Sequence, residues 1–576
     1  MEKRYKFDLS IETILIIVAL LLIIKYNFDF PLDADVHFVI KSGEEIWQTG
    51  GFPLYDSFSW VPLELKVPYI NVEWLSCLLL YLLYNKGGFL LITIYKIFIY
   101  GLGYFILFSF ARKKYGLLPA SIAIITGIYL GRWFLSPRAL MHSAVLFPLV
   151  TYMLLYDEEK PFNKKFFLYL PLIFLIWTNL HGAFLIGLVY VYPGFLINYY
   201  FKAKNMEYKE KQKLFLSYLL LMMLCLIITF ITPYGSKIFW KTLVYFTPAS
   251  IKIFLKLNTE YQSPLSYIKI FDYYFIITLP VSIIMLIYSS RRFHFKLSPV
   301  ELYTFIFFLA ISLKAVRNIQ LFSIACIPIY AFIIGNTIEI CKKHNFLNKN
   351  LIPSGKLSYI FISIKIICLF FILFHFATVL TRTDPTGKRL EQKLFPTNLK
   401  QFLIKNSLPS HLYNHEIIGC YLLFHLYPQY KVSIDTRDRL VYSPEYYLEF
   451  NASLHDTEKL IKFLDKYEID VSIIDLKYHP HLLENHPDWF LLYKEGRYLL
   501  YIRNNEKNKK IIKDFKNDKL YYPDIYECDA FLYLNFIDSK DYRKARKYIK
   551  KLIQYYPEDK NLRDYLRELN KLCEIK

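Results

Sequence analysis

Long apolar segments bounded by Lys and Arg recur through the first 380 residues, with clear examples at residues 11–24 and 359–380. About 20 apolar residues suffice to cross the hydrocarbon core of a bilayer as a helix, which satisfies its own backbone hydrogen bonds there. The whole chain of 576 residues is 55% hydrophobic and 19% aromatic, which is too apolar for an ordinary soluble protein of this size. The bilayer is therefore the expected solvent for this region.

The sequence predicts about eleven membrane-spanning helices. The candidate spans are residues 11–28, 88–110, 117–131, 141–156, 166–180, 182–200, 214–231, 273–289, 298–314, 318–336 and 358–380. Short loops rich in Lys and Arg resist translocation, and a cytoplasmic N-terminus makes every inner connection basic. We therefore expect a multi-pass protein of the cell inner (plasma) membrane. An odd number of spans puts its C-terminus outside.

The charge and the cysteines exclude other classes of protein. The formal net charge is +21, but the cytoplasmic turns facing anionic lipid headgroups explain much of it, so nucleic acid is not an expected partner. The eight cysteines form no CxxC pair, so the pattern indicates neither a zinc site nor a disulfide framework.

Beyond residue 380 the apolar runs shorten to strand length and the charge rises. Residues 1–380 are expected to form the membrane domain, and residues 381–506 a soluble extracytoplasmic α/β domain. YNHEIIGCYLLFHL, YKVSIDTR, DVSIIDL and FLLYKEGRYLLYIR suggest strands or buried segments, with a hairpin at Lys494-Glu495-Gly496 and a helical pattern in DTEKLIKFLDKY. In YKVSIDTRDR, self-pairing of Asp435, Arg437, Asp438 and Arg439 at a turn is favoured over a binding role.

Residues 507–576 have a helical pattern that matches one tetratricopeptide (TPR) repeat at Tyr542, Ala545 and Pro557. A helical, TPR-like tail could bind a protein partner. A helical hairpin packed on the preceding domain is the favoured alternative, because one repeat cannot bury its own apolar face.

The first external loop, residues 29–87, carries the acidic cluster Asp33-Ala34-Asp35-Val36-His37 directly after the first span. Carboxylates at headgroup level are placed to meet a lipid-linked substrate, and an inverting glycosyl transfer needs one such base. Asp33 and Asp35 would diverge by about 200° on a helix, so we do not expect an interchangeable pair. Solvated acids at a helix end are the structural alternative. The segment VEWLSCLLLYLLYNKGG suggests a short helix lying along the membrane.

The run PLDADVHFVIKSGEEIWQTGGFPLYDSFSW, followed by NVEWLS, HGAF, TPYG, EYQSP and VRNIQLFSIACIPI, covers most of the first 330 residues. It resembles bacterial members of the GT-C glycosyltransferase superfamily related to protein O-mannosyltransferases and the lipid A aminoarabinose transferase, in a branch of predicted membrane proteins. The resemblance implies a GT-C-like membrane fold with an acidic motif at the start of the first external loop. It places the catalytic base at Asp35 or Asp33, with Asp35 favoured. On an extended segment His37 would lie on the same side as Asp35 and could orient its carboxylate, although a structural hydrogen bond is equally expected.

Polar residues at the predicted outer ends of other spans are candidates for substrate binding, because charge at the membrane boundary is costly without a partner. Arg138 and Arg317 are the candidates for the donor phosphate, with snorkelling to headgroups as the alternative. The other candidates are Glu73, His142, His181 and Glu260, for which capping, pairing or buried hydrogen bonds are the structural alternatives.

The function expected from these features is transfer of a sugar from a polyprenyl-phosphate-linked donor to a lipid, glycan or protein acceptor on the extracytoplasmic face. Membrane lipids are further partners. A divalent cation could assist, but the sequence requires none, and no metal ligand is assigned. The alternatives are a noncatalytic membrane assembly or scaffold protein, and a transporter or flippase of lipid-linked saccharide, which would place ionisable groups in mid-span.

Overall fold

The computed structural model describes most of the chain in two compact units. The described residues are 11–29, 33–61, 68–244, 259–267, 273–289, 295–343, 391, 394–437, 441–478 and 483–574. The first unit comprises residues 1–33, 42–52 and 70–387, and the second comprises residues 34–41, 53–69 and 388–576. Three segments separated in sequence therefore contribute to each unit.

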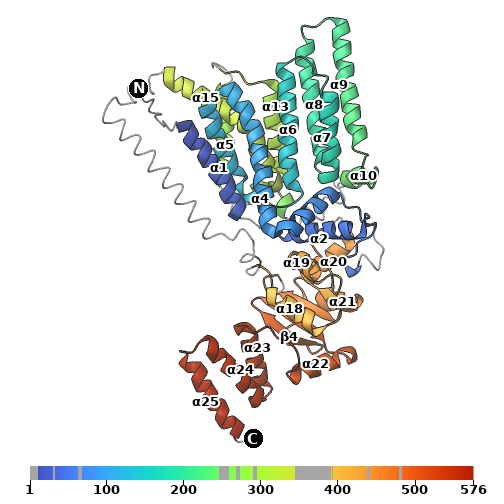
Figure 1. Cartoon of the computed structure of the whole chain (residues 1–576), viewed down its shortest axis with the longest axis vertical. Coiled ribbons are helices and arrows are strands. Elements are labelled where there is room, and N and C mark those ends of the chain that lie inside the picture. Colours follow the sequence, from blue (N-terminus) through green and yellow to red (C-terminus); the bar gives the residue numbers. More distant parts are fainter. Residues whose placement is uncertain are drawn as a thin grey trace, which may run out of the picture. The chain divides into compact units, whose positions relative to one another are not determined.

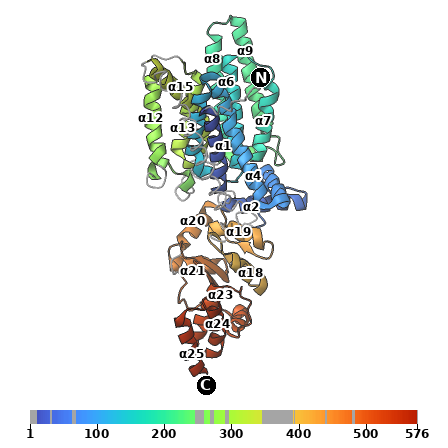
Figure 2. The same cartoon turned by 60° about the vertical axis from the view of Figure 1, so that its left-hand side comes forward.

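The first unit is a bundle of apolar helices (Figures 1 and 2). Its elements are α1 (Ile11–Asp29), α4 (Trp74–Tyr115), α5 (Leu117–Gly131), η1 (Arg132–Phe134), α6 (Leu140–Glu159), α7 (Phe166–Leu180), α8 (Phe184–Ala203), α9 (Tyr208–Ile228), α10 (Lys237–Val244), η2 (Thr259–Tyr261), η3 (Pro264–Tyr267), α12 (Tyr273–Ser289), α13 (Pro299–Lys314), η4 (Val316–Asn318), α14 (Ile319–Ala325) and α15 (Ile327–Lys343). Helix α5 packs against α1, α4 and α15, and α12 lies beside α15 (Figure 2). Small residues permit the close approach: a Cβ at Gly103 of α4 would lie 2.1 Å from the Ala144 carbonyl oxygen of α6.

This unit makes the chain a multi-pass membrane protein, but the expected count of eleven spans is not confirmed. In the described part of the chain, six helices are long and apolar enough to cross a membrane, and a seventh span results if the bent pair 316–325 and 327–341 is counted as one. Helix α7 and residues 278–287 of α12 are apolar but shorter. The predicted span at 358–380 lies outside the described residues.

Helix α4 contains both the short helix predicted in the first loop and the following span. It runs for 42 residues, but Gly87 and Gly88 have non-helical backbone angles. Gly88 has a φ of +60°, which glycine adopts without strain. The predicted end of the loop at residue 87 therefore coincides with a kink.

The second unit contains a five-stranded mixed sheet in the order β2-β1-β3-β5-β4. Its strands are β1 (His411–Tyr413), β2 (Lys431–Val432), β3 (Val471–Asp475), β4 (Trp489–Glu495) and β5 (Tyr498–Arg503). β1 pairs in parallel with β2 and β3, while β5 pairs antiparallel with β3 and β4. The predicted hairpin at Gly496 is confirmed, because β4 and β5 flank it and Gly496 has a φ of +52°.

Helices accompany the sheet. They are α18 (Thr397–Asn406), α19 (Glu416–Leu426), α20 (Pro444–Ser453), α21 (Thr457–Lys466), η7 (Glu506–Asn508) and α22 (Lys509–Lys516). The helix predicted in DTEKLIKFLDKY is confirmed as α21. Of the two alternatives for YNHEIIGCYLLFHL, a strand or a buried segment, most of it forms the largely buried helix α19. The helix starts there because the His415 imidazole accepts a hydrogen bond from the Ile417 amide, which caps it.

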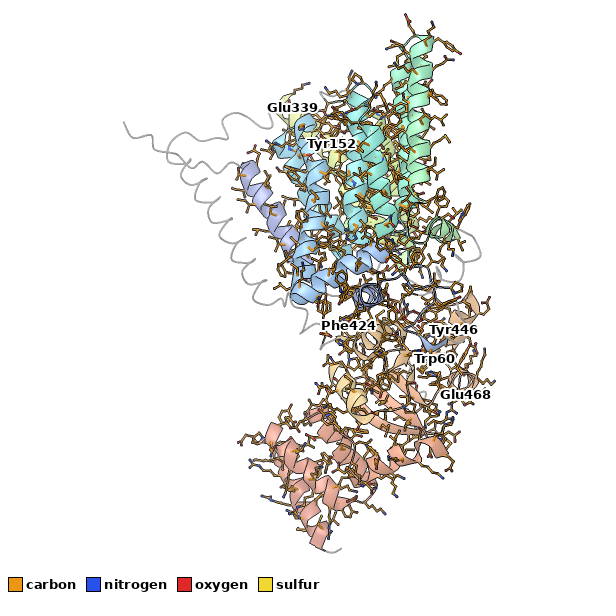
Figure 3. All side chains as sticks on the ribbon, turned by 45° about the vertical axis from the view of Figure 1, so that its right-hand side comes forward. Trp60, Tyr152, Glu339, Phe424, Tyr446 and Glu468 are labelled. Carbon is orange, nitrogen blue, oxygen red and sulfur yellow. The ribbon has the colours of Figure 1, made fainter. Side chains whose placement is uncertain are left out.

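The first loop supplies two further segments to this second unit. Helix α2 (Ala34–Thr49) contributes residues 34–41, and residues 53–69 form a second segment. Trp60 lies among the side chains of this unit (Figure 3), where its indole N–H donates to the Leu412 carbonyl at 3.1 Å. The sequence gives no local signal for this association, which joins residues about 350 positions apart.

Three helices end the chain: α23 (Tyr526–Asp538), α24 (Tyr542–Tyr555) and α25 (Lys560–Glu574). α24 packs against both neighbours, and Ala545 is buried in α24. A tetratricopeptide relationship and a separate domain beginning at residue 507 remain predictions.

Candidate functional site

Seven of the nine predicted site residues belong to the first unit, and most of them form two hydrogen-bonded groups at helix ends. The seven are Asp33, Glu73, Arg138, His142, His181, Glu260 and Arg317. The two others, Asp35 and His37, belong to the second unit.

Arg138 is the centre of the first group. It follows η1 in the connection to α6, and its Nε lies 3.1 Å from Asp33 Oδ2. Its two terminal nitrogens donate to the two oxygens of Glu260, at 2.6 and 3.3 Å. The Ser136 hydroxyl donates to Asp33 Oδ2 at 2.6 Å. The Arg138 guanidinium thus brings together Asp33 and Glu260, which lie far apart in the sequence. Its forked N–H groups have the geometry that suits carboxylates and phosphates.

Arg317 adds a second cation to this group. Its guanidinium lies 4.9 Å from the centre of the Tyr261 ring, and the Val316 amide beside it donates to the Gln262 carbonyl at 3.0 Å. Burial alone would raise the pKa of Glu260, but Arg138 and Arg317 hold it below its ordinary value. Both predicted phosphate candidates therefore act electrostatically on the same carboxylate, and Arg138 also binds it directly.

Lys96 is a third cation of the group that the sequence analysis missed. It is fully buried in α4, and its ammonium donates to the Leu135 carbonyl at 3.1 Å. It lies close enough to Asp33 for an electrostatic interaction. A signal was present, because a lysine inside the apolar run FLLITIYKIFIYGLG is costly in a membrane and commonly functional.

The second group contains two of the three predicted histidines. His181 lies between α7 and α8, with Nε2 3.5 Å from Glu73 and Nδ1 2.9 Å from the Ser143 hydroxyl. His142 Nδ1 lies 2.9 Å from the Ser76 hydroxyl, and its Nε2 lies 3.0 Å from the Tyr95 hydroxyl. Burial, followed by the nearby cation Arg317, lowers the pKa of His181 well below its ordinary value. His181 is therefore a neutral hydrogen-bonding group at pH 7.

An open, mostly apolar cavity of about 410 Å³ lies beside this second group. It is lined by Trp74, Leu75, Leu175, Ile176, Asn179, Ile231, Thr232 and Pro233. The Trp74 indole donates to the Asn179 side-chain oxygen at 2.8 Å, which fixes part of the wall. Such a surface suits an apolar chain better than a sugar.

Asp35 and His37 do not share one side of an extended segment, because α2 begins at Ala34. Residues two positions apart on a helix diverge, so the expected orienting contact between them is wrong. Asp35 accepts a hydrogen bond from the Thr436 hydroxyl, whose oxygen lies 3.0 Å from the Cys420 sulfur. His37 instead approaches Glu391 and His425.

The expected self-pairing at the turn is confirmed for Asp435 and Arg437, which follow strand β2. Arg437 is fully buried and donates to both Asp435 oxygens, at 2.8 and 2.6 Å. It also pairs with Asp56, which the sequence analysis did not single out, and donates to the Ser59 hydroxyl at 3.3 Å. Asp438 and Arg439 lie outside the described residues.

Comparisons with known proteins match this chain through its structure. No protein-family model and no curated protein sequence matches. The archaeal oligosaccharyltransferase AglB from Archaeoglobus fulgidus, solved with an inhibitory peptide and a dolichol-phosphate, is similar with a TM-score of 0.53 and 10% identity, over 86% of this chain and 74% of that one. ArnT from Cupriavidus metallidurans, solved with undecaprenyl phosphate, gives a TM-score of 0.46 and 12% identity, over 85% of this chain and 97% of that one.

The likeness to AglB establishes the fold. This chain has the fold of the GT-C membrane glycosyltransferases, as the resemblance in its sequence predicted.

Proposed function

We propose that this chain is a membrane glycosyltransferase that moves a sugar from a polyprenyl-phosphate-linked donor to a lipid, glycan or protein acceptor on the extracytoplasmic face. The observation that carries the proposal is the group formed by Lys96, Arg138 and Arg317 around Asp33 and Glu260. The fold supports the proposal, because AglB, to which this chain is similar, was solved with a dolichol-phosphate. The inner membrane and an outward C-terminal region are part of the proposal and rest on the basic inner loops.

The three cations suit the phosphate of such a donor. When the sugar leaves, negative charge develops on the phosphate oxygen, and fixed cations in a water-poor site stabilise that charge most strongly. Arg138 and Arg317 carry forked guanidinium groups. Glu260 binds Arg138 directly and acts electrostatically on Arg317. We assign donor binding to these arginines and to Lys96. Glu260 positions the arginines.

Asp35 is assigned as the base that takes the acceptor's proton, and Asp33 as a residue that positions Arg138. The Asp33 carboxylate is engaged by a cation, whereas Asp35 accepts from the neutral Thr436 hydroxyl. The ion pair commits the Asp33 carboxylate to Arg138, so Asp33 is given the positioning role and Asp35 the role of base. One residue separates the two aspartates in sequence, so their Cα atoms lie within about 7 Å of each other.

Glu73, His142 and His181 are proposed to face the transferred sugar or the acceptor. They offer one carboxylate and two imidazoles from a single hydrogen-bonded group of the first unit. The neighbouring apolar cavity is proposed to hold part of a lipid chain.

The test compares strains that lack the protein and carry either the wild type, Asp35→Asn, Asp33→Asn or the exposed control Glu458→Gln. Lipid and glycan profiling is expected to find a glycoform that wild type and control restore. Loss of a general base costs about 10²- to 10⁴-fold in rate, so Asp35→Asn should restore almost none of it. Full restoration by Asp35→Asn would contradict the assignment of the base. A profile unchanged by loss of the protein would contradict glycosyl transfer.

A further inference from the structure

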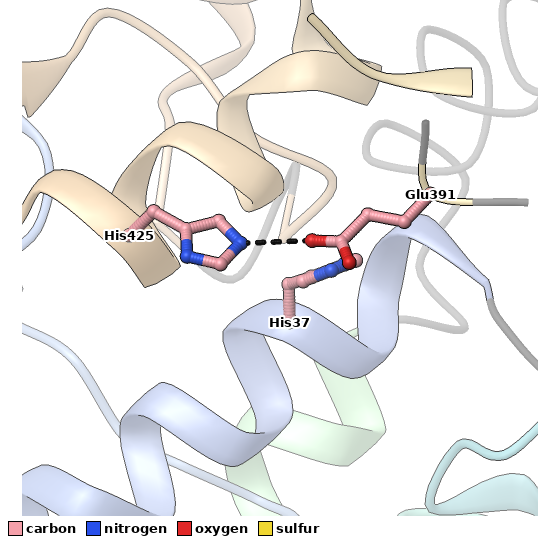
Figure 4. Close-up of side chains that lie close together, drawn as sticks. All are labelled: His37, Glu391 and His425. Atoms are coloured by element: carbon pink, nitrogen blue, oxygen red, sulfur yellow. Dashed lines mark hydrogen bonds and ion pairs between the residues drawn. The ribbon is translucent and has the colours of Figure 1, made fainter. Parts of the chain in front are cut away.

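Three side chains with metal-binding groups meet in the second unit. They are His37 from α2, His425 from α19, and Glu391 (Figure 4). One ligand atom from each lies within 4.8 Å of the other two, and His425 Nε2 is 3.0 Å from Glu391 Oε1. Three segments distant in sequence thus present two imidazoles and one carboxylate to a single point.

This set of groups matches the chemistry of zinc. Two histidines and one glutamate are a known ligand set for Zn²⁺, which binds nitrogen and oxygen at about 2.0–2.2 Å and leaves a fourth position for water. Ligand atoms around a tetrahedral ion of that size are about 3.4 Å apart. The 3.0 Å between His425 Nε2 and Glu391 Oε1 is slightly shorter than this separation, and small side-chain rotations would bring all three groups to it.

The surroundings of His37 hold it in the form that binds metal. Its Nδ1 lies 3.3 Å from the Ala34 carbonyl oxygen, which cannot donate, so Nδ1 carries the proton and Nε2 keeps its lone pair. Metal-bound histidines are commonly held by such a contact to a backbone carbonyl.

Aromatic side chains enclose the cluster. The rings of Phe395, Tyr421 and Phe424 lie edge-on to the His37 ring, with centroids 5.3, 5.7 and 5.3 Å away. His37 itself is fully buried. An apolar wall limits access of water and strengthens the attraction between a carboxylate and a cation.

We propose that His37, Glu391 and His425 bind one Zn²⁺ ion, which fastens the first turn of α2 to α19 and the segment at residue 391. The ion would tie together sequence-distant parts of one compact unit and keep its fourth position for water. The proposal stands independently of glycosyl transfer.

The experiment uses the full chain purified in detergent. Bound metal is measured by mass spectrometry, and Zn²⁺ affinity is measured by calorimetry after metal is stripped with a chelator. Wild type and the control His455→Ala, whose histidine is exposed in the same unit, are expected to bind about one Zn²⁺. His37→Ala, Glu391→Gln and His425→Gln should each weaken binding by more than about tenfold.

Two outcomes would overturn the proposal. One is wild-type protein that takes up no Zn²⁺, and the other is binding by the three variants as tight as that of the control. Co²⁺ substitution of the wild type gives a readout that does not depend on the variants folding. Strong tetrahedral absorption bands are expected, and a weak octahedral spectrum counts against the site.

Discussion

Arg138 divides one guanidinium between Asp33 and Glu260, so its loss leaves two carboxylates facing each other without their shared cation. The Arg138–Glu260 pair is partly exposed, which reduces its value relative to a buried pair. We predict a coupling free energy of about 0.5–3 kcal/mol in a double-mutant cycle of Arg138→Gln and Glu260→Gln. Hydrogen exchange of the peptide covering residues 259–267 measures it, and additive effects of the two changes would contradict the pairing.

His181 gives a prediction about pH. Burial lowers its pKa in the folded protein well below the ordinary value of 6.5, so the folded state binds fewer protons than the unfolded state. The stability is therefore fully present above about pH 6.5 and is lost as the pH falls below it. Thermal unfolding between about pH 7 and pH 5 should show a smaller loss for His181→Gln than for wild type. The exposed control His455→Gln should follow wild type, and equal losses in all three proteins would contradict the prediction.

At the residue scale, the sequence indicated which charged residues would need partners better than it indicated what those partners are. Arg138, Glu260 and Arg317 stood out because charge at a span end needs a partner, and they do converge. Lys96 was overlooked inside an apolar run. The contacts of His37 could not be predicted, because Glu391 and His425 lie more than 350 residues further along the chain.

Among the elements, α2 and the first part of α4 approach closely where α2 carries Gly43. A Cβ at Gly43 would lie 2.1 Å from the Cys77 carbonyl oxygen and 2.7 Å from Tyr81 Cβ, so even alanine forces the helices apart. We predict that Gly43→Ala destabilises the first unit by about 1–3 kcal/mol. Gly51→Ala in the same loop is the matched control, because nothing lies within 4 Å of the added carbon.

Hydrogen exchange of the peptides covering residues 42–52 and 74–86 measures this effect. Faster exchange is expected in Gly43→Ala and not in Gly51→Ala. Unchanged exchange in Gly43→Ala would show that the two helices do not depend on this close contact.

Apolar length was enough to locate helix α1 and helices α4 to α9, because a membrane span must be a continuous apolar helix. It could not give the number of membrane-spanning helices. The apolar parts of α7 and α12 are shorter than a full span, and α14 and α15 meet at a 52° bend. Residues 411–426 were harder still. Their short apolar run fits a strand or a buried helix equally well, and the structure divides it between β1 and α19.

For the whole molecule, the second unit is completed by residues 34–41 and 53–69 of the first loop. We predict that a fragment of residues 388–576 is unstable alone, because the buried Arg437 loses Asp56, and Leu412 loses the Trp60 indole. Removing one partner of a buried ion pair typically costs about 3–5 kcal/mol. Adding a peptide of residues 53–69 should raise the fragment's melting temperature.

A peptide with Asp56→Asn and Trp60→Ala is the control and should give little stabilisation. If the fragment melts at the same temperature with either peptide or with none, the first-loop segment is not part of this folding unit.

The bond between the Ser59 and Tyr442 hydroxyls joins residues 383 positions apart. Chains are synthesised at about 5–20 residues per second, so the earlier segment leaves the ribosome about 20–80 s before its partner exists. Throughout that interval Asp56 lacks its ion-pair partner Arg437. Phe58 and Trp60, which are buried in the folded unit, lack the side chains that cover them. During biosynthesis, the first-loop segment that carries Asp56 must therefore avoid non-native contacts until the last third of the chain has been synthesised.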